Sequence, residues 1–169
     1  MTAPKIKSKP KGLDRPSTTR VIRLMSAAHI RVYRATRGRL GKNWRIGSAL
    51  RRPVPVCLLT TTGRKSGQPR SVPLLYLQDG ADYVVVASKG GMPEHPQWYR
   101  NLEANPEVQI EIGGRRVDCR ARTAGADERA RLWPQLVERY ADYASYQSWT
   151  EREIPVVICA PVAADARRG

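Results

Sequence analysis

The chain has 169 residues, with 30 Lys and Arg against 15 Asp and Glu, which gives a net charge of +15. Residues 1–52 hold 15 Lys and Arg and a single acid, so they carry +14 and the rest of the chain carries +1. The longest uncharged runs, Pro53–Gly63 and Ile154–Ala164, are shorter than the roughly 18 apolar residues of a membrane-spanning helix. The first residues also lack the apolar core of a secretory signal, so we expect a cytoplasmic protein.

The N-terminal third divides into three segments. Residues 1–16 alternate Lys, Pro and small residues and predict a disordered basic tail. Residues 17–37 predict an amphipathic helix, because apolar residues recur at three- and four-residue spacing while arginines gather on the opposite side. Residues 38–52 are rich in Gly and basic residues and predict a linker. The apolar stripe of the helix consists of Val21, Leu24, Met25, Ala28, Val32 and Ala35.

From residue 53 to residue 162 the pattern changes to short strands separated by Gly-rich turns, and residues 163–169 form a tail. Three successive hairpin-type strands argue against alternating βαβ units, so the pattern predicts an α+β domain with a small barrel of mainly antiparallel strands. A proline at position 134 should kink or shorten the helix that contains it. We expect strands at 54–62, 70–77, 83–88, 108–112, 116–123 and 154–160, and helices at 97–104 and 127–140.

The cysteines are odd in number, far apart, and each within an apolar run: Cys57, Cys119 and Cys159. The chain has no C-x-x-C pair, which disfavours a zinc or dithiol redox site. We therefore expect three reduced, buried thiols.

Three short segments could bind a ligand. The Gly-bounded turn that holds Arg64, Lys65 and Ser66 is followed by Arg70, a pattern typical of a phosphate or carboxylate cradle, although a basic hairpin turn explains it equally well. A predicted strand ends in Ser-Lys-Gly-Gly at 88–91, which offers a hydroxyl, an ammonium and backbone donors. The third segment holds tyrosines at 140, 143 and 146 on one side of a helical turn, which fits either a packing edge or an aromatic wall for a flat ligand.

The residues alone supply no catalytic machinery. His95 is a lone loop histidine, which is more often solvated than catalytic. There is no ligand cluster for a metal and no carboxylate pair at a compelling spacing. A redox cofactor would therefore have to bring the chemistry.

Residues 53–160 resemble the deazaflavin-dependent nitroreductase and quinone reductase family of actinobacteria, which uses coenzyme F420. The strings that carry the resemblance are LLTTTGRKSGQPR, ASKGG, HPQWYRNLEANPEV, WPQLVERYADYASYQSW and IPVVICAP. The resemblance implies a split β-barrel related to flavin-binding reductases. It also implies hydride transfer from reduced F420 to a quinone, a nitroaromatic compound or an activated enone. FMN is the less favoured cofactor.

The resemblance also assigns roles to individual residues. Ser88 and Tyr143 are expected to be the catalytic residues, which hydrogen-bond to cofactor or substrate oxygen, and Tyr143 is also a candidate proton shuttle. The acidic tail of the cofactor is expected at Arg64, Lys65, Ser66, Gln68 and Arg70, and the deazaflavin ring at Pro73, Ala87, Ser88, Lys89, Gln97 and Trp98. The acceptor is expected at Leu75, Tyr140, Tyr143 and Tyr146.

One position departs from the family pattern. Leu75 stands where nitroreductase members carry a tyrosine, and Tyr76 follows it. Because neighbouring strand residues face opposite sides of a sheet, Tyr76 is not expected to replace that tyrosine. Quinone reduction is therefore the expected activity, and bicyclic nitroimidazole reduction stays open.

Two other classes of protein fit some of these features. A non-catalytic carrier or sensor of F420 or FMN would need the same binding residues. A nucleic-acid-binding protein would use the basic arm, but the sequence has no helix-turn-helix, RNP strings or zinc spacing, so no nucleic-acid partner is expected. The helix at 17–37 either lies on an anionic membrane, where menaquinone is a candidate acceptor, or packs on the barrel or a partner subunit with its arginines outward. The oligomeric state stays open.

Overall fold

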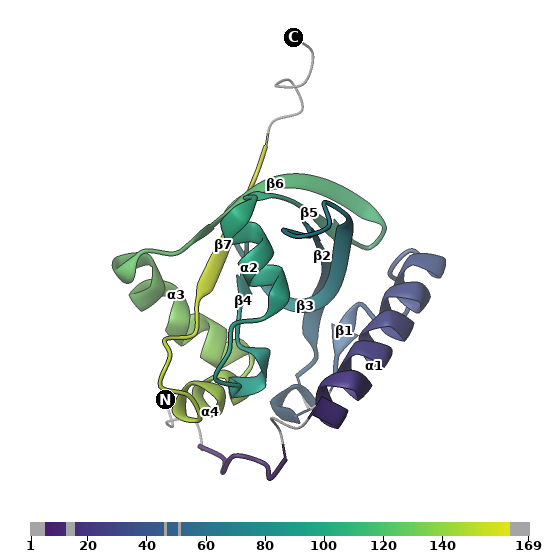
Figure 1. Cartoon of the computed structure of the whole chain (residues 1–169). Helices are drawn as coiled ribbons and strands as arrows, with labels where there is room; N and C mark the ends of the chain where they lie inside the picture. Colours follow the sequence, from purple (N-terminus) through teal and green to yellow (C-terminus); the bar gives the residue numbers. More distant parts are fainter. Residues whose placement is uncertain (1–5, 13–15, 46, 51, 163–169) are drawn as a thin grey trace.

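A computed structural model describes residues 6–12, 16–45, 47–50 and 52–162 (Figure 1). The N-terminal third contains helix α1 (Pro16–Ala35), strand β1 (Asn43–Trp44) and the 3-10 turn η1 (Gly47–Leu50). The remaining strands are β2 (Val54–Thr62), β3 (Pro69–Asp79), β4 (Asp82–Val86), β5 (Glu107–Ile112), β6 (Arg115–Thr123) and β7 (Val156–Pro161). The remaining helical elements are η2 (Lys89–Gly91), α2 (Gln97–Ala104), α3 (Ala126–Arg139) and α4 (Asp142–Ser148).

Strands β2 to β7 close into a barrel. Their order is β2-β3-β4-β7-β6-β5, and β5 pairs back onto β2 between Leu58 and Thr61. Every neighbouring pair is antiparallel. Strand β7, from the far end of the chain, lies between β4 and β6, whereas tight hairpins join β2 to β3, β3 to β4 and β5 to β6. The predicted α+β split barrel is confirmed.

Two apolar clusters hold the barrel together, one on each face of its strands. The inner cluster takes alternate residues from all six strands and is closed at one end by α2. The outer cluster lies between the barrel and helices α3 and α4. Strand β4 shows the alternation, since Val85 belongs to the inner cluster and Val84 to the outer one.

The cysteines belong to the inner cluster. Cys57, Cys119 and Cys159 are all free and buried, as predicted. Burial raises the pKa of the Cys57 thiol to about 12 and that of Cys119 to about 11. These thiols therefore stay protonated and act as small apolar core residues.

Three sequence-based expectations about the elements need correction. The segment 38–52 is not simply a linker, because it contains η1 and also β1, which pairs Asn43 with Pro55 at the edge of β2. Helix α1 ends at Ala35 rather than at residue 37. Helix α3 continues past Pro134 to Arg139, because Leu132 and Leu136 on either side of the proline are both buried in the outer cluster.

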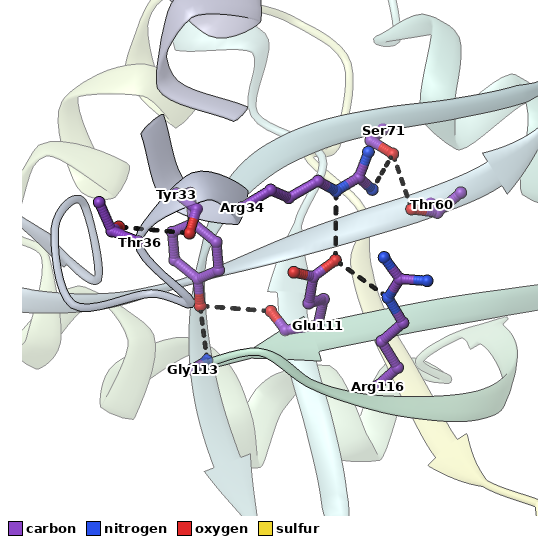
Figure 2. Close-up of polar contacts among 8 residues, drawn as sticks. All are labelled: Tyr33, Arg34, Thr36, Thr60, Ser71, Glu111, Gly113 and Arg116. Carbon is purple, nitrogen blue, oxygen red and sulfur yellow. Dashed lines mark hydrogen bonds and ion pairs between the residues drawn. The ribbon is translucent and has the colours of Figure 1, made fainter. Parts of the chain in front are cut away.

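Helix α1 is attached to the barrel by a polar contact (Figure 2). The ring of Tyr33 is fully buried, and its hydroxyl accepts a hydrogen bond from the Gly113 N–H at 2.9 Å. The Arg34 Nε lies 3.3 Å from the Glu111 carboxylate, and Arg116 pairs with the same oxygen at 3.4 Å. The Glu111 side chain is only 5% exposed, so it is a buried carboxylate shared by two arginines.

The apolar stripe of α1 faces away from the barrel. Its larger members are about half exposed or more: Val21 (53%), Leu24 (67%), Met25 (62%) and Val32 (46%). The alternative in which α1 packs on the barrel with its arginines outward is therefore only half right. The helix does pack on the barrel, but Arg34 points inward, where it binds Ser71 on β3 and pairs with buried Glu111 on β5.

Candidate functional site

The turn between β2 and β3 holds the residues that were predicted to form an anion cradle. A hydrogen bond from the Gly63 N–H to the Gln68 carbonyl (2.9 Å) closes the turn, and Gly67 adopts a φ of 66°. Arg64, Lys65 and Arg70 are all exposed around it. None of the three forms an ion pair with a carboxylate in the described part of the chain, so their charges are available to an acidic ligand.

A buried amide ties this turn to α2. Asn101, which is 5% exposed, accepts a hydrogen bond from the Arg64 backbone N–H (3.2 Å) and donates one to the Thr61 hydroxyl (3.2 Å). The Arg64 guanidinium donates to Gln97 at 2.8 Å. Two predicted site residues, Arg64 and Gln97, are therefore in direct contact, and Asn101 positions the turn. Sequence reasoning missed Asn101, because a single asparagine in a helix carries no periodic signal.

The loop after β4 presents the second predicted segment. Ala87 is buried and Ser88 is half-buried. Lys89, Gly90 and Gly91 adopt φ values of 47°, 63° and 76°, three successive left-handed residues of which the first is not a glycine. Such backbone is costly for lysine and persists where the surroundings hold it. The Lys89 ammonium pairs with Glu94 at 3.3 Å.

Two of the residues predicted around the deazaflavin ring have mainly packing contacts. Trp98 is 8% exposed and packs edge-on against Tyr99 in the inner cluster. Pro73 lies half-buried on β3, opposite Leu58. His95 is half-buried between Tyr99 and Arg152, and burial first, then the Arg152 charge, lowers its pKa.

The third segment forms an aromatic wall on α4 and the turn before it. The rings of Tyr140 and Tyr143 lie 5.1 Å apart, and Tyr146 lies 6.1 and 6.3 Å from them. The Tyr140 and Tyr146 hydroxyls are 3.2 Å apart. Tyr143 is only 5% exposed, and burial raises its pKa far above the ordinary value. Its phenol is therefore neutral near pH 7 and keeps a proton that it could donate.

Leu75 and Tyr76 lie on opposite faces of β3, as predicted. Leu75 packs against the outer cluster, which contains the three tyrosines, whereas Tyr76 packs against the inner cluster and the ring of Tyr83. Tyr76 therefore does not contribute a hydroxyl to the tyrosine wall.

Part of the predicted disordered tail is bound to α4 and the residue that follows it. Lys7 pairs with Asp142 at 2.5 Å, its backbone N–H donates to Ser145, and its carbonyl accepts from the Trp149 ring. Burial raises the pKa of Asp142, but the Lys7 ammonium and the Ser48 N–H outweigh it, so the pKa is lowered overall. The partners of Lys7 lie far away along the chain, so the sequence of the tail does not predict these contacts. Residues 1–5, 13–15 and 163–169 lie outside the described residues.

The loop after β4 lies directly against the tyrosine wall. A side chain added at Gly91 would meet the Tyr146 carbonyl oxygen at 2.8 Å and the Trp149 ring at 3.1 Å. Contacts therefore connect the three predicted segments one after another: Gln97 and Asn101 of α2 bind the cationic turn, the loop after β4 leads into α2, and Gly91 of that loop touches α4. Exposed cations and left-handed backbone suit an anionic group, whereas the Tyr140 and Tyr143 rings are buried in the outer cluster.

The fold is an α+β split barrel, and comparisons with known proteins identify its family as one of barrel reductases. The family model of F420H2-dependent quinone reductases matches residues 25–161, so the chain belongs to that family. It is 44% identical over 149 residues to an F420H2-dependent quinone reductase of Mycobacterium tuberculosis, covering 86% of this chain and 93% of the relative. The protein is an F420H2-dependent oxidoreductase, and its cofactor is coenzyme F420.

Solved structures agree with this assignment. An F420H2-dependent reductase, FDR-A, is 47% identical with a TM-score of 0.58, covering 62% of this chain and 93% of that one. A domain-swapped dimer is 38% identical with a TM-score of 0.62, covering 84% of this chain and 98% of that one. A protein of unknown function from Agrobacterium tumefaciens is 17% identical with a TM-score of 0.52 and shares the fold alone.

Proposed function

We propose that the protein reduces a quinone with a hydride from reduced F420, and that the β2–β3 turn holds the acidic tail of the cofactor. The observation that carries the proposal is the group of cations at this turn that lack acidic partners among the described residues. Guanidinium and ammonium groups bind phosphate and carboxylate oxygens by charge-assisted hydrogen bonds. The proposed tail-binding residues are Arg64, Lys65, Ser66, Gln68 and Arg70.

We propose that the deazaflavin ring binds beside the loop after β4. The half-buried Ser88 hydroxyl and the left-handed backbone that follows it would offer donors to the ring's oxygen and nitrogen atoms. Gln97 is held by Arg64, so the ring and tail contacts come from one connected set. The proposed residues around the ring are Pro73, Ala87, Ser88, Lys89, Gln97 and Trp98.

The acceptor would lie against the tyrosine wall, with Leu75 beside it. When bound, reduced F420 supplies the hydride, which leaves from C5 of its ring. The neutral Tyr143 phenol, kept protonated by burial, would donate a hydrogen bond to the acceptor oxygen on which negative charge develops. Ser88 would orient the cofactor, and the close aromatic packing would exclude water. The proposed acceptor-binding residues are Leu75, Tyr140, Tyr143 and Tyr146.

Titration of the purified protein with F420 and, separately, with FMN tests the cofactor assignment. We expect saturable binding of F420 and weaker or no binding of FMN. Addition of menadione to the reduced complex then separates an enzyme from a carrier. An enzyme oxidises the cofactor in many turnovers, whereas binding without oxidation above the no-enzyme control would favour a non-catalytic carrier.

We further propose that α1 lies on an anionic membrane surface, from which a lipid-soluble quinone such as menaquinone would reach the site. None of the helices among the described residues is long and apolar enough to cross a membrane. The support is the outward stripe of Val21, Leu24, Met25 and Val32, with exposed Arg20 and Arg31 on the same helix. Apolar burial and attraction to anionic lipid act together in this arrangement.

Vesicle flotation tests the membrane proposal. The full chain should float with vesicles that contain phosphatidylglycerol and much less with phosphatidylcholine alone. The double variant Leu24→Gln, Met25→Gln should lose flotation, whereas Val162→Gln, which changes an exposed apolar residue near the other end of the chain, should not. Equal flotation of both variants would overturn the proposal.

A further inference from the structure

Arg152, which was not predicted for the site, forms hydrogen bonds with the loop after β4. The loop joins β4 to α2 and contains the three left-handed residues Lys89–Gly91. Arg152 lies outside it, in the segment between α4 and β7. The Arg152 Nη2 donates to the carbonyls of Ala87 (3.2 Å) and Ser88 (2.9 Å), and its Nε donates to the carbonyl of Met92 (3.1 Å).

The fourth contact of Arg152 is with a histidine. Its Nη1 lies 3.2 Å from the His95 Nδ1. Because a guanidinium carries only donors, this nitrogen must be the acceptor, and the imidazole must be neutral. One side chain therefore binds four residues of the loop, from its first residue to the segment just before α2.

Arg152 does not form an ion pair with a carboxylate in the part of the chain that the structure describes. It is half-buried, and burial lowers its pKa from an ordinary value far above neutrality, so it remains charged. A half-buried cation that binds only carbonyls and an imidazole is not explained as a surface ion pair. The N–H groups of its guanidinium instead point at the backbone carbonyls of a strained loop.

The backbone of Arg152 is also tied to α4. Its carbonyl accepts a hydrogen bond from Gln147 Nε2 at 2.8 Å, and Gln147 Oε1 accepts from the Ile154 N–H. On its other side, the loop touches α4 through Gly91, which leaves no room for a side chain against Tyr146. Arg152 therefore links the loop to the helix that carries two of the tyrosines.

We infer that Arg152 is a positioning residue that fixes the Ser88 loop relative to the tyrosine wall of α4. The inference rests on the proposed function, in which the loop contacts the hydride donor and the wall contacts the acceptor. Hydride transfer requires donor and acceptor to be held in contact, and small displacements are costly in rate. Arg152 would thus act on the reaction through Ser88 and Tyr146 without touching either reactant.

Hydrogen exchange of the protein without cofactor tests the contact directly. In Arg152→Gln, the backbone amides of residues 87–95 should exchange about tenfold faster or more, because four contacts are lost, while those of β2 should not change. Arg152→Lys keeps the charge and should give an intermediate result. Arg122→Gln is the matched control, since it removes an arginine that is paired with Glu128 away from the loop.

Binding and turnover then separate a positioning role from simple stabilisation. Arg152→Gln should weaken F420 binding about tenfold and lower kcat with menadione by more than Arg122→Gln does, and Arg152→Lys should recover part of both. Gly91→Ala disturbs the loop from its α4 side and should reproduce the loss of kcat if Arg152→Gln does not fold. Faster loop exchange with unchanged F420 affinity and kcat would overturn the inference, as would unchanged exchange in Arg152→Gln.

If the wild-type protein fails to bind F420, the proposed function fails and the inference fails with it. The exchange measurement distinguishes this case, because it would still report whether Arg152 restrains the loop.

Discussion

Among single residues, the cations of the β2–β3 turn give the most direct test of cofactor binding. Lys65 is exposed and forms no ion pair with a carboxylate among the described residues. Lys65→Gln should weaken F420 binding about tenfold, which corresponds to about 1.4 kcal/mol, and the loss should shrink as salt screens the charge. Arg139→Gln removes an exposed cation at the opposite end of β2 and should have no effect. An equal loss of F420 affinity in both variants would show that Lys65 contributes only through the net charge of the protein.

The Tyr143 hydroxyl is predicted to act as a neutral donor. Tyr143→Phe should lower kcat with menadione about tenfold or more while the fold stays intact. Because burial raises the pKa of this phenol, its proton is present throughout the neutral range. The ratio of wild-type to variant kcat should therefore stay constant between pH 6 and 9. Tyr76→Phe, which changes the opposite face of β3, is the control. A ratio that falls steeply with pH would contradict the donor role.

Ser88 is predicted to act through its hydroxyl, since its carbonyl already accepts from Arg152. Ser88→Ala leaves that backbone contact in place and should lower turnover by weakening the contact with the cofactor. The same kinetic assay checks this result, with circular dichroism to confirm the fold. Wild-type F420 affinity and turnover in Ser88→Ala would remove Ser88 from the site.

Among the elements, α1 is attached to the barrel in part by the buried Tyr33 hydroxyl. Tyr33→Phe removes the hydroxyl that binds the Gly113 N–H and should lower the free energy of unfolding by about 1 kcal/mol. Chemical denaturation measures this change. Tyr83→Phe, at another buried ring, should cost less. Equal unfolding free energies for wild type and Tyr33→Phe would show that the hydroxyl does not secure α1.

The start of α3 depends on a carboxylate. Glu128 accepts hydrogen bonds from Arg122 and from the Gly125 N–H, and these contacts lower its pKa from 4.5 to about 2. A lowered acid pKa stabilises the fold above the ordinary value, and this contribution is lost as the pH falls toward the folded pKa. The Tm difference between wild type and Glu128→Gln should therefore be present at pH 6 and vanish near pH 2.

The elements with strong local patterns were the ones that sequence predicted well. Strand β2 and helix α2 have their predicted bounds, because Gly63 and Pro106 mark clear ends. Strand β1 was missed because two residues have no periodicity, and it exists only by pairing with β2. The stripe on α1 correctly predicted a helix but not its packing face, which a buried carboxylate on β5 determines. Arg152 was missed because its partners are carbonyls from a distant loop.

In the whole molecule, the strongly basic N-terminal third is the part proposed to contact a membrane, and the nearly neutral barrel is the part proposed to bind the cofactor. The N-terminal third carries almost all of the net charge of +15. It includes both the outward face of α1 and Lys7, which pairs with Asp142 on α4. The barrel is nearly neutral, and the cations proposed to bind the cofactor lie together at the β2–β3 turn. The double variant Arg20→Gln, Arg31→Gln on the exposed surface of α1 should therefore lose affinity for anionic vesicles while it still binds F420 through the barrel, which flotation and titration together measure.

Anaerobic mixing of the protein with reduced F420 and menadione tests the central claim most directly. Hydride transfer from C5 predicts oxidation of the cofactor at a rate proportional to protein concentration, and slower oxidation when C5 carries deuterium. A protein that binds F420 but gives no oxidation above the no-enzyme control would contradict the account.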